Sequence, residues 1–580
     1  VPSILRRVER FPLKSSGKVD EARLRELAAS TPADAEPLKQ EQCEVGWTPT
    51  ERALALLWRR RLPGVLVHRK SSLLDLGGHS LLAMRLAADI AVEFQRTLSP
   101  ARLLEAESLA DVARFIDCVP REQTDTHAEQ PARRAPAGDE SPTAGIRQRL
   151  LAASHLDSSG DAYIVPVAFT LPSVVPIELI RDSFRTLIER HEMLRYASND
   201  ADAAAEKVHA APPEGWWTAH KNTIEVPAGS WPDAILHRIY RPLDPATGGP
   251  TRIDVWPAAG SNWLVIWTTH HAVIDEWSIR LLLDQFVGLL GGRPVTTTGD
   301  PRAFFDREHN LADAEKARQQ AAGIAGTLGE VSIPFPNWSG PATEIDLPID
   351  DGIVSALADV ARRAGATRVA PALAAYGLAI QEVLGAAWRF VSTPIAKRHS
   401  PDLIDSVNCC LEMRVVECGA RAGESAGALV RRVRDELVSC QDRGFVPFDI
   451  ITTELRHRRA DLAAAPMQFG FTWRRDPCPV IPLADPGAGA AGLPGELRTL
   501  RVPQRTTVFG CTLHIEETAG CLRARFEVCG ECAASGVARR LALAFRESVL
   551  RLAVAPEMKA CAATDLNAAT PGKEWIDPDQ

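Results

Sequence analysis

The sequence has no long hydrophobic run and no processing signal. It contains no stretch of about 18 consecutive apolar residues, the length that a membrane-spanning helix needs. The N-terminus also lacks the succession of positive, apolar and small residues that marks a secretory signal peptide. Without either feature, we expect a cytoplasmic protein.

The chain also lacks an excess of positive charge. Lys and Arg number 66 against 74 Asp and Glu, so the formal net charge is −8. Binding to nucleic acid or to an anionic membrane surface depends on clustered positive charge. We therefore expect neither nucleic acid nor a membrane as a partner.

Metal-binding patterns are scarce as well. The twelve cysteines have no regular spacing, and only Cys529 and Cys532 form a CxxC pair. Structural zinc sites combine such a pair with a second pair or with histidines. A single pair is better explained by cysteines at loop or strand ends, and scattered cysteines suit a reducing compartment. The sequence predicts no metal site.

The length and composition that are present indicate several domains. A chain of 580 residues is long for one compact unit, and 45% hydrophobic with 24% charged residues is ordinary for a globular protein. Shifts towards proline, charge and small polar residues mark linkers and a tail. The predicted order is a remnant of a truncated domain at 1–30, a linker at 31–45, a domain at 46–118, a flexible linker at 119–143, a large domain at 144–558 and a polar tail at 559–580.

Region 46–118 is predicted to be a small all-α four-helix bundle. Thr48, Pro49 and Glu51 form a helix start with an N-cap, a first-turn proline and a capping-box acid. Two segments repeat apolar residues at helical spacing, and 108–116 suggests a further helix. The apolar positions are Leu54, Leu57, Trp58, Leu82, Leu86 and Ile90.

Region 144–558 mixes strands and helices. Strand-like runs at 163–171, 262–271, 509–517 and 522–529 alternate with long amphipathic helical segments at 177–194 and 535–553. This mixture predicts an α/β domain of about 400 residues, which is large enough to divide into two lobes.

The sharpest motif, DLGGHSLLAMRL, covers residues 75–86. Gly77 and Gly78 allow a tight turn, and Ser80 then stands at a helix N-terminus, where unpaired amides and the helix dipole favour an anion. Taken alone, Ser80 could be a simple N-cap. Together with the surrounding helices, the motif resembles the attachment site of peptidyl carrier proteins. The resemblance implies a 4'-phosphopantetheine arm on Ser80, transferred from CoA by a phosphopantetheinyl transferase.

A second motif, HHAVIDEWS, contains His270, His271, Asp275 and Trp277. Adjacent strand residues point to opposite faces, so only one of the two histidines can face a given site. The same sequence could arise from two histidines in the core and an aspartate that caps a helix. A metal site would need a third ligand, and none is apparent. The motif resembles the HHxxxD sequence of condensation domains, which join carrier-bound substrates through a peptide bond.

This second resemblance implies both a fold and a site. Region 144–558 would be an α/β domain of chloramphenicol-acetyltransferase type, with an N-lobe at about 144–315 and a C-lobe at about 316–558. His271, with His270 beside it, would lie near the attacking amine, where a neutral imidazole can accept or orient a proton. Asp275 would organise the site by pairing with an arginine of the other lobe, and Arg398 matches that position best.

Weaker matches follow the order of the condensation family along the chain. They are RHEMLR at 190–195, SVNCCLEMRV at 406–415, VPFDII at 446–451 and APMQFGFTW at 465–473. Several features depart from the family pattern. Arg147 stands where glutamine is usual, although Arg149 remains, and Glu276 replaces the glycine that usually follows the aspartate. The segment PRAFFDREHN at 301–310 also lacks the tyrosine and tryptophan expected of the family's fourth motif. The departures predict unusual substrate handling.

Residues 15–24, SSGKVDEARL, resemble the last motif of adenylation domains, with Lys18 as the lysine that contacts the adenylate. The segment is not a P-loop, because Pro12 and Val19 stand where that pattern needs glycine and serine or threonine. The rest of an ATP site is missing. We therefore expect Lys18 to perform no adenylation here, and an upstream adenylation domain to be a partner.

The predicted function is a carrier and condensation unit of a nonribosomal peptide synthetase. The donor thioester would be held through Ser80, and the acceptor would be an amine on a carrier in trans or a free amine. Two alternatives remain open. Epimerisation domains share HHxxxD and also follow a carrier, and a degenerate condensation-like domain could serve only to dock carriers or recruit a partner enzyme.

Overall fold

The computed structural model describes most of two regions, 46–119 and 145–554. Gaps within them are 63–64, 75, 77, 79, 97, 99, 157–159, 198–206, 209–210, 227–230, 244–248, 296–298, 302, 306–307, 309–311, 399–400, 442–443, 484–492 and 519–520. The predictions for Lys18, for both linkers and for the C-terminal tail therefore lie outside the described residues. The chain folds into two compact units that divide near residue 128.

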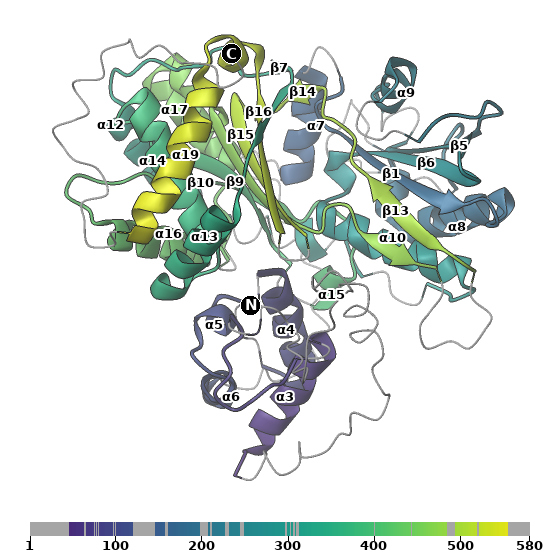
Figure 1. Cartoon of the computed structure of the whole chain (residues 1–580), viewed down its shortest axis with the longest axis horizontal. Coiled ribbons are helices and arrows are strands. Elements are labelled where there is room, and N and C mark those ends of the chain that lie inside the picture. The colour runs from purple at the N-terminus through teal and green to yellow at the C-terminus, as the bar shows by residue number, and fades with distance from the viewer. Residues whose placement is uncertain are drawn as a thin grey trace, which may run out of the picture. The chain divides into compact units, whose positions relative to one another are not determined.

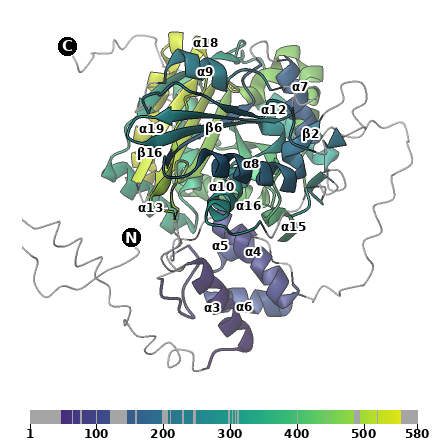
Figure 2. The same ribbon diagram turned by 90° about the vertical axis from the view of Figure 1, so that its right-hand side faces the viewer.

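The first unit is a bundle of short helices (Figures 1 and 2). Its described helices are α3 (Pro49–Arg61), α4 (Ser80–Phe94), α5 (Pro100–Glu105) and α6 (Leu109–Cys118). The predicted capping box is present, because the Thr48 hydroxyl accepts from the Glu51 amide at 3.1 Å and the Glu51 carboxylate accepts from the Thr48 amide at 2.9 Å. The predicted helix start is thereby confirmed.

The bundle core uses the apolar positions that the sequence pattern selects. Leu54, Trp58 and Leu86 are fully buried, and α6 adds Leu109 and Val112 to the same cluster. The short helix α5, which the sequence pattern did not single out, closes the bundle against α4. The four described helices agree with the four-helix bundle predicted for this region.

The second unit contains two six-stranded sheets, and the first is almost wholly antiparallel. Its strand order is β12-β13-β1-β6-β5-β4, and only β4 and β5 pair in parallel. The strands are β1 (Ile164–Pro172), β4 (Trp217–Ala219), β5 (Thr251–Ala258), β6 (Asn262–His270), β12 (Val480–Pro482) and β13 (Glu496–Leu500). Strands β12 and β13, from the expected second lobe, thus join the first sheet, where Leu500 pairs with Ala168.

The first sheet is covered on both faces. Helices α8 (Ile177–Arg190) and α10 (Glu276–Leu290) bury one face through an aromatic cluster in which the Phe184 and Phe286 ring centroids lie 4.6 Å apart. On the other face, α9 (Asp233–Ile239) and its neighbours contribute a second apolar cluster that includes Trp231. This packing anchors the end of β6 and the start of α10.

The second sheet has the order β10-β9-β11-β15-β16-β8. Its strands are β8 (Thr343–Leu347), β9 (Phe390–Ala396), β10 (Leu411–Glu417), β11 (Phe469–Arg475), β15 (Cys511–Thr518) and β16 (Cys521–Val528). Helices gather on one of its faces (Figure 1). They are α12 (Ala314–Leu328), α13 (Asp351–Ala364), α14 (Val369–Leu384), α16 (Ala426–Ser439), α17 (Phe448–Arg458) and α19 (Val537–Val554).

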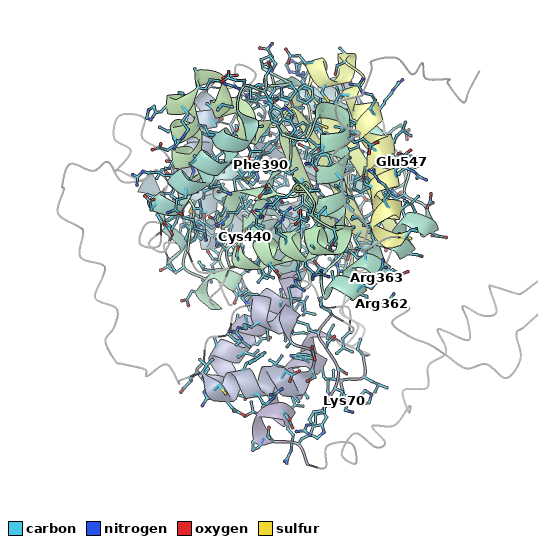
Figure 3. All side chains as sticks on the ribbon, turned by 90° about the vertical axis from the view of Figure 1, so that its left-hand side faces the viewer. Lys70, Arg362, Arg363, Phe390, Cys440 and Glu547 are labelled. Carbon is cyan, nitrogen blue, oxygen red and sulfur yellow. The ribbon has the colours of Figure 1, made fainter. Side chains whose placement is uncertain are left out.

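These helices bury one side and expose charge on the other. Tyr376 of α14 is fully buried and donates through its hydroxyl to the Cys511 carbonyl at 3.0 Å. Figure 3 shows Arg362 and Arg363 near the end of α13 and Glu547 on α19, all three of them exposed. The amphipathic helices predicted at 177–194 and 535–553 are therefore present as α8 and α19.

Among the residues that the structure describes, no helix combines the length and the apolar character needed to cross a bilayer. Within the same ranges, no group of three or more His, Cys, Asp or Glu side chains is arranged to hold a metal ion. Cys529 and Cys532 are buried thiols at the N-cap and within α18 (Gly530–Ala534), directly after strand β16.

Candidate active site

The HHxxxD residues lie in the connection between β6 and α10. Strand β6 ends at His270, a single 3₁₀ turn follows at His271–Val273, and Asp275 is the N-cap of α10. The apolar strand run and the following helical run fix both ends of this connection in the first-lobe core. The motif therefore stands on a rigid strand-to-helix junction.

His271 is held by two backbone carbonyls, one of them from its own turn. Its amide donates to the Tyr163 carbonyl at 2.9 Å, and its ring Nδ1 lies 2.9 Å from the Ile274 carbonyl oxygen. Because a carbonyl can only accept, the neutral ring carries its proton on Nδ1 and keeps a lone pair on Nε2. The ring is only partly buried. His271 is thus oriented with a basic nitrogen away from its anchoring bond.

His270 has a different environment. It is 1% exposed, and its Nδ1 accepts from the Ala272 amide at 3.1 Å, which caps the 3₁₀ turn. Accepting at Nδ1 places the proton of the neutral ring on Nε2, the opposite tautomer from His271. The two histidines are therefore used differently: His270 shapes the turn, and His271 is presented by it.

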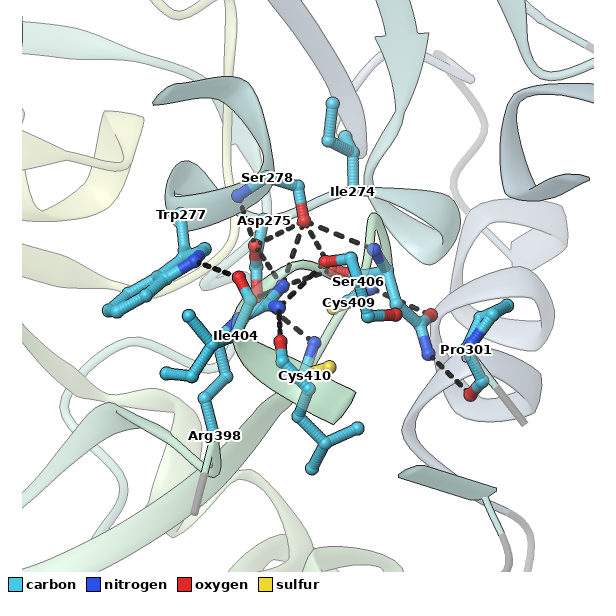
Figure 4. A network of polar contacts seen from close by, with 12 residues as sticks. Ile274, Asp275, Trp277, Ser278, Pro301, Arg398, Ile404, Ser406, Cys409 and Cys410 are labelled. Atoms are coloured by element: carbon cyan, nitrogen blue, oxygen red, sulfur yellow. Dashed lines mark hydrogen bonds and ion pairs between the residues drawn. The ribbon is translucent and has the colours of Figure 1, made fainter. Parts of the chain in front are cut away.

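Asp275 connects three parts of the domain (Figure 4). Its Oδ1 accepts from the Ser278 amide and hydroxyl, both at 2.8 Å, as expected of an N-cap. Arg398 donates from Nη2 to both carboxylate oxygens at 2.9 Å, and the Cys410 amide donates to Oδ2 at 3.0 Å. One carboxylate thereby fixes the start of α10 and binds two segments of the second lobe.

The Asp275–Arg398 ion pair is almost completely removed from water, with side chains 2% and 0% exposed. Burial lowers the pKa of Arg398, but the adjacent Asp275 carboxylate raises it, and the net direction is upward. A buried charge persists only where opposite charge and hydrogen bonds replace water. Here the pair has both, so Arg398 stays a cation.

Backbone carbonyls complete the environment of the guanidinium. Arg398 donates from Nη1 to the Ser406 carbonyl at 2.7 Å and also to the Leu403 carbonyl, and from Nη2 to the Asn408 carbonyl at 3.0 Å. The Trp277 ring centroid lies 5.7 Å from the guanidinium carbon. Arg398 therefore gathers the loop after β9 around the HHxxxD turn, on the side of the second lobe.

The SVNCC segment supplies further contacts. Asn408 is buried and donates from its side chain to the Pro301 carbonyl at 3.1 Å. The Cys409 Sγ lies 3.9 Å from His271 Nδ1, and burial raises the pKa of this thiol well above its usual range. Because the thiolate is the reactive form, Cys409 fills space beside the histidine and does not act as a nucleophile.

Two other predicted residues bind across the lobes. Arg149 donates to Asp449, the acid of the VPFDII segment, at 2.7 Å and to Glu308 at 3.0 Å. Glu276, at the usual glycine position, forms an ion pair of 3.0 Å with Arg474 of β11. The departure at 276 is thus accommodated by a specific partner from the other lobe.

Arg147 and Arg414 have buried packing roles. The Arg147 guanidinium lies 3.9 Å from the Phe305 ring centroid and 4.5 Å from that of Tyr196, and burial lowers its pKa. Arg414 forms an ion pair with Glu412 at 3.0 Å. Neither contact is with the HHxxxD turn.

In the helical unit, Ser80 is the first residue of α4, whose first-turn amides have no partner within the helix. Nearby Gly78 approaches the chain closely: its amide donates to the Leu73 carbonyl at 2.7 Å, and an added Cβ would lie 2.4 Å from that oxygen. Gly78 is therefore needed for close approach and has no positive φ. A serine at the first position of a helix fits a phosphodiester-linked arm.

Sequence reasoning missed several groups that build the site. Ser278 could have been found, because a serine three residues after an aspartate is an N-cap partner. The Ile274 and Ser406 carbonyls and the Cys410 amide carry no side-chain signal, since any residue could supply them. The Arg149 partner Asp449 stood in a noted motif, but its contact depends on the fold.

Comparison with known proteins identifies two families within the chain. Residues 139–558 match the condensation domain family, and residues 54–116 match the phosphopantetheine attachment site family. The chain is 26% identical over 476 residues to tyrocidine synthase 2 of Brevibacillus parabrevis, covering 78% of this chain and 12% of that protein. It is 23% identical over 499 residues to malpinin synthetase of Mortierella alpina, covering 82% of this chain and 6% of that protein. The chain thus spans only a small part of the length of these relatives.

Solved structures share the fold. A four-domain nonribosomal peptide synthetase bound to AMP and glycine superposes with a TM-score of 0.55 at 15% identity, over 71% of this chain and 33% of that one. The first condensation domain of the CDA synthetase gives 0.51 at 18% identity, over 71% and 96%. They confirm the predicted two-lobed α/β fold of chloramphenicol-acetyltransferase type. The chain therefore belongs to the condensation domain family and carries, ahead of that domain, a phosphopantetheine-binding carrier domain, the arrangement of a nonribosomal peptide synthetase.

Proposed function

We propose that this chain forms an amide bond between an acyl group held on its carrier domain and an acceptor amine, with His271 as the proton acceptor. The observation that carries the proposal is the contact of the His271 ring with the Ile274 carbonyl. Its Nδ1 is 2.9 Å from the Ile274 carbonyl, which leaves Nε2 as the basic atom. A general base needs a positioned lone pair within reach of the proton that it removes.

The groups around His271 position its ring and do not accept the proton that it removes from the amine. The bond from Nδ1 to the Ile274 carbonyl strengthens when the ring becomes cationic, which stabilises the imidazolium formed as the carbon–nitrogen bond develops. Asp275 cannot act as a second base while Arg398 occupies both of its oxygens at 2.9 Å. Asp275 and Arg398 are positioning residues, and His270 caps the 3₁₀ turn by accepting from the Ala272 amide.

On the carrier, Ser80 is the attachment point for 4'-phosphopantetheine. When bound, the arm would supply the acyl group as a thioester, whose carbon–sulfur bond breaks as the carbon–nitrogen bond forms and whose sulfur leaves as the free thiol with the proton that His271 accepted. Because the thioester is already activated, neither nucleotide nor metal is required for amide formation. A phosphopantetheinyl transferase with CoA primes Ser80, and an upstream adenylation domain loads it. Because the carrier precedes the condensation domain, we assign it as donor, with the acceptor amine on a carrier in trans or free.

The test is intact-protein mass spectrometry in deuterated buffer. Ser80 is loaded with an aminoacyl pantetheine, a small amine is added, and His271→Ala is compared with the wild type. Loss of the acyl mass, with an amide product that His271→Ala abolishes, supports condensation. Acyl mass retained with deuterium gained indicates epimerisation, and acyl mass retained without deuterium indicates a docking domain; either result contradicts the proposal.

A further inference from the structure

The second sheet has one apolar and one charged face. On β15, the residues Cys511, Leu513 and Ile515 belong to the apolar core under the helices. The alternate residues, including His514 and Glu516, point to the opposite face, because side chains of a strand alternate. In Figure 1 the helices α12, α14, α16 and α19 lie on the other face of this sheet, and the charged face is on the side of the first lobe.

Charges of alternating sign cross this face from strand to strand. Glu516 of β15 lies directly opposite Arg474 of β11 in the parallel register. On its other side, Glu516 accepts from Arg525 of β16 at 2.7 Å, and Arg525 lies 3.5 Å from Glu344 of β8. We call the whole series the charge ladder; its members are Glu276, Arg474, Glu516, Arg525, Glu344 and Arg501.

Both ends of the charge ladder are joined to the first lobe. At one end, Glu276 is the first residue of α10, immediately after Asp275, and pairs with Arg474 at 3.0 Å. At the other end, Glu344 pairs with Arg501, which follows β13 of the first sheet and whose carbonyl accepts from Trp231 at 2.8 Å. The ladder therefore bridges the lobes twice across one face of the second sheet.

A second pair reinforces the end beside the active site. Arg280, one helical turn after Glu276, lies 4.0 Å from Asp476, just beyond the end of β11. Helix α10 thus presents an acid and then a base, while the end of β11 presents a base and then an acid. This reciprocal order favours one alignment of the two elements, because a shift along either would bring like charges together.

The electrostatics of the ladder depend on its continuity. Burial raises the pKa of Glu516, but Arg525, Arg474 and Arg501 lower it by more. The net shift is downward, so the carboxylate stays ionised. Arg474 stands between two acids, Glu276 and Glu516. Neutralising Arg474 removes both the ion-pair partner of Glu276 and the cation opposite Glu516, whereas neutralising Glu276 leaves Arg474 at its register position opposite Glu516.

We propose that the charge ladder sets how the second lobe meets the HHxxxD turn, and that Glu276 and Arg474 are positioning residues for the condensation reaction. The effect on rate rests on the proposed function; the effect on the turn itself does not. A half-exposed ion pair changes an equilibrium by about 1 kcal/mol at most, which corresponds to a change of about fivefold or less. The ladder therefore adjusts the site and does not hold the domain folded.

The experiment compares Arg474→Gln, Glu276→Gln and their combination with Arg551→Gln in the full chain. Arg551 is a matched control, since it pairs with Glu382 at 2.6 Å with similar exposure but within the second lobe. Hydrogen exchange is followed in peptides covering 271–279 and 470–476. The kcat and KM for the amine acceptor are measured at low and high salt, and thermal unfolding reports folding.

We expect Arg474→Gln to speed exchange in both peptides and to lower kcat/KM about two- to fivefold at low salt, with a smaller difference at high salt. Glu276→Gln should have a smaller effect, and the double variant should be no worse than Arg474→Gln. Exchange at 271–279 that matches the Arg551→Gln control would overturn the inference. If no variant or wild type forms an amide, the proposed function fails, and the exchange data still decide the role of the ladder.

Discussion

Replacing Asp275 with asparagine should destabilise the condensation domain strongly although the side chain keeps its size. The asparagine oxygen can still accept from the Ser278 amide, so the cap of α10 survives. In the native protein, the second carboxylate oxygen of Asp275 accepts from Arg398 Nη2 at 2.9 Å and from the Cys410 amide at 3.0 Å. In the variant, the side-chain NH2 group of asparagine would face these two donors. A donor would meet donors, and a fully buried guanidinium would lose its counter-charge.

The magnitude follows from the burial of both partners. Breaking a buried ion pair by removing one member costs about 3–5 kcal/mol, because the remaining charge stays out of water without compensation. Arg398 and Asp275 are 0% and 2% exposed, so solvent offers little relief. For a domain spanning residues 139–558, an unfolding entropy of about 2 cal/mol/K per residue converts each kcal/mol into a shift of about 1 °C.

The assay is a double-mutant cycle by thermal and urea unfolding of the full chain. Asp275→Asn and Arg398→Met should each lower the melting temperature of the condensation domain by about 3–5 °C. The double variant leaves no uncompensated charge and should be more stable than the sum of the two losses by about 2 kcal/mol or more. Strictly additive losses would refute this reasoning, because they would mean that the two side chains are not energetically coupled.

Four further outcomes test other parts of the structure. Gly78→Ala should lower the melting temperature of the carrier domain and slow phosphopantetheine transfer from CoA, measured as mass gain, because the added Cβ meets backbone; unchanged priming would contradict this. Burial raises the pKa of Glu436 to about 7, so the folded state binds this proton more tightly than the unfolded state, and stability falls as pH rises from 4.5 through 7. Urea unfolding should therefore find Glu436→Gln more stable than wild type above pH 7, with the gain vanishing below pH 4.5. Iodoacetamide should leave Cys409 unmodified in the native chain by peptide mass spectrometry, and labelling there with loss of activity would make it a reactive thiol. His270→Asn keeps an acceptor for the Ala272 amide and should retain most of the amide-forming rate in the mass assay, whereas His271→Asn lacks a proton acceptor at the Nε2 position and should lose it; equal losses without a change in stability would show that both rings serve the reaction.

Local sequence patterns predicted the elements on which the site stands. The helical period and the Thr48 capping box located α3, and the apolar run before His270 located β6, because these signals depend only on neighbouring residues. The short strands β12 and β13 were not predicted. With three and five residues they have too few positions for an alternating pattern, and their place in the first sheet depends on pairing with β1 across the lobes.

Only part of the site could be predicted from the sequence. Asp275 and Arg398 could be brought together only by family resemblance, because 123 positions separate them and no period connects them. The backbone carbonyls that surround Arg398 could not be predicted, because every residue has a carbonyl and no residue type marks the ones that bind. The charge ladder is an intermediate case: the alternation on β15 is visible as TLHIEE, but the order of its partner strands is set by the sheet.

The spacing of the HHxxxD motif has a physical reason in this structure. A single 3₁₀ turn at His271–Val273 connects His271 to Asp275, and the Ile274 amide closes it by donating to the His271 carbonyl at 3.4 Å. That turn returns the Ile274 carbonyl to the imidazole and leaves Asp275 in extended conformation at the helix start. One residue fewer would remove the carbonyl that fixes the tautomer, and one more would rotate the carboxylate away from Arg398. The same three residues therefore set the ring orientation of the base and the contact between the lobes, so neither can change without the other.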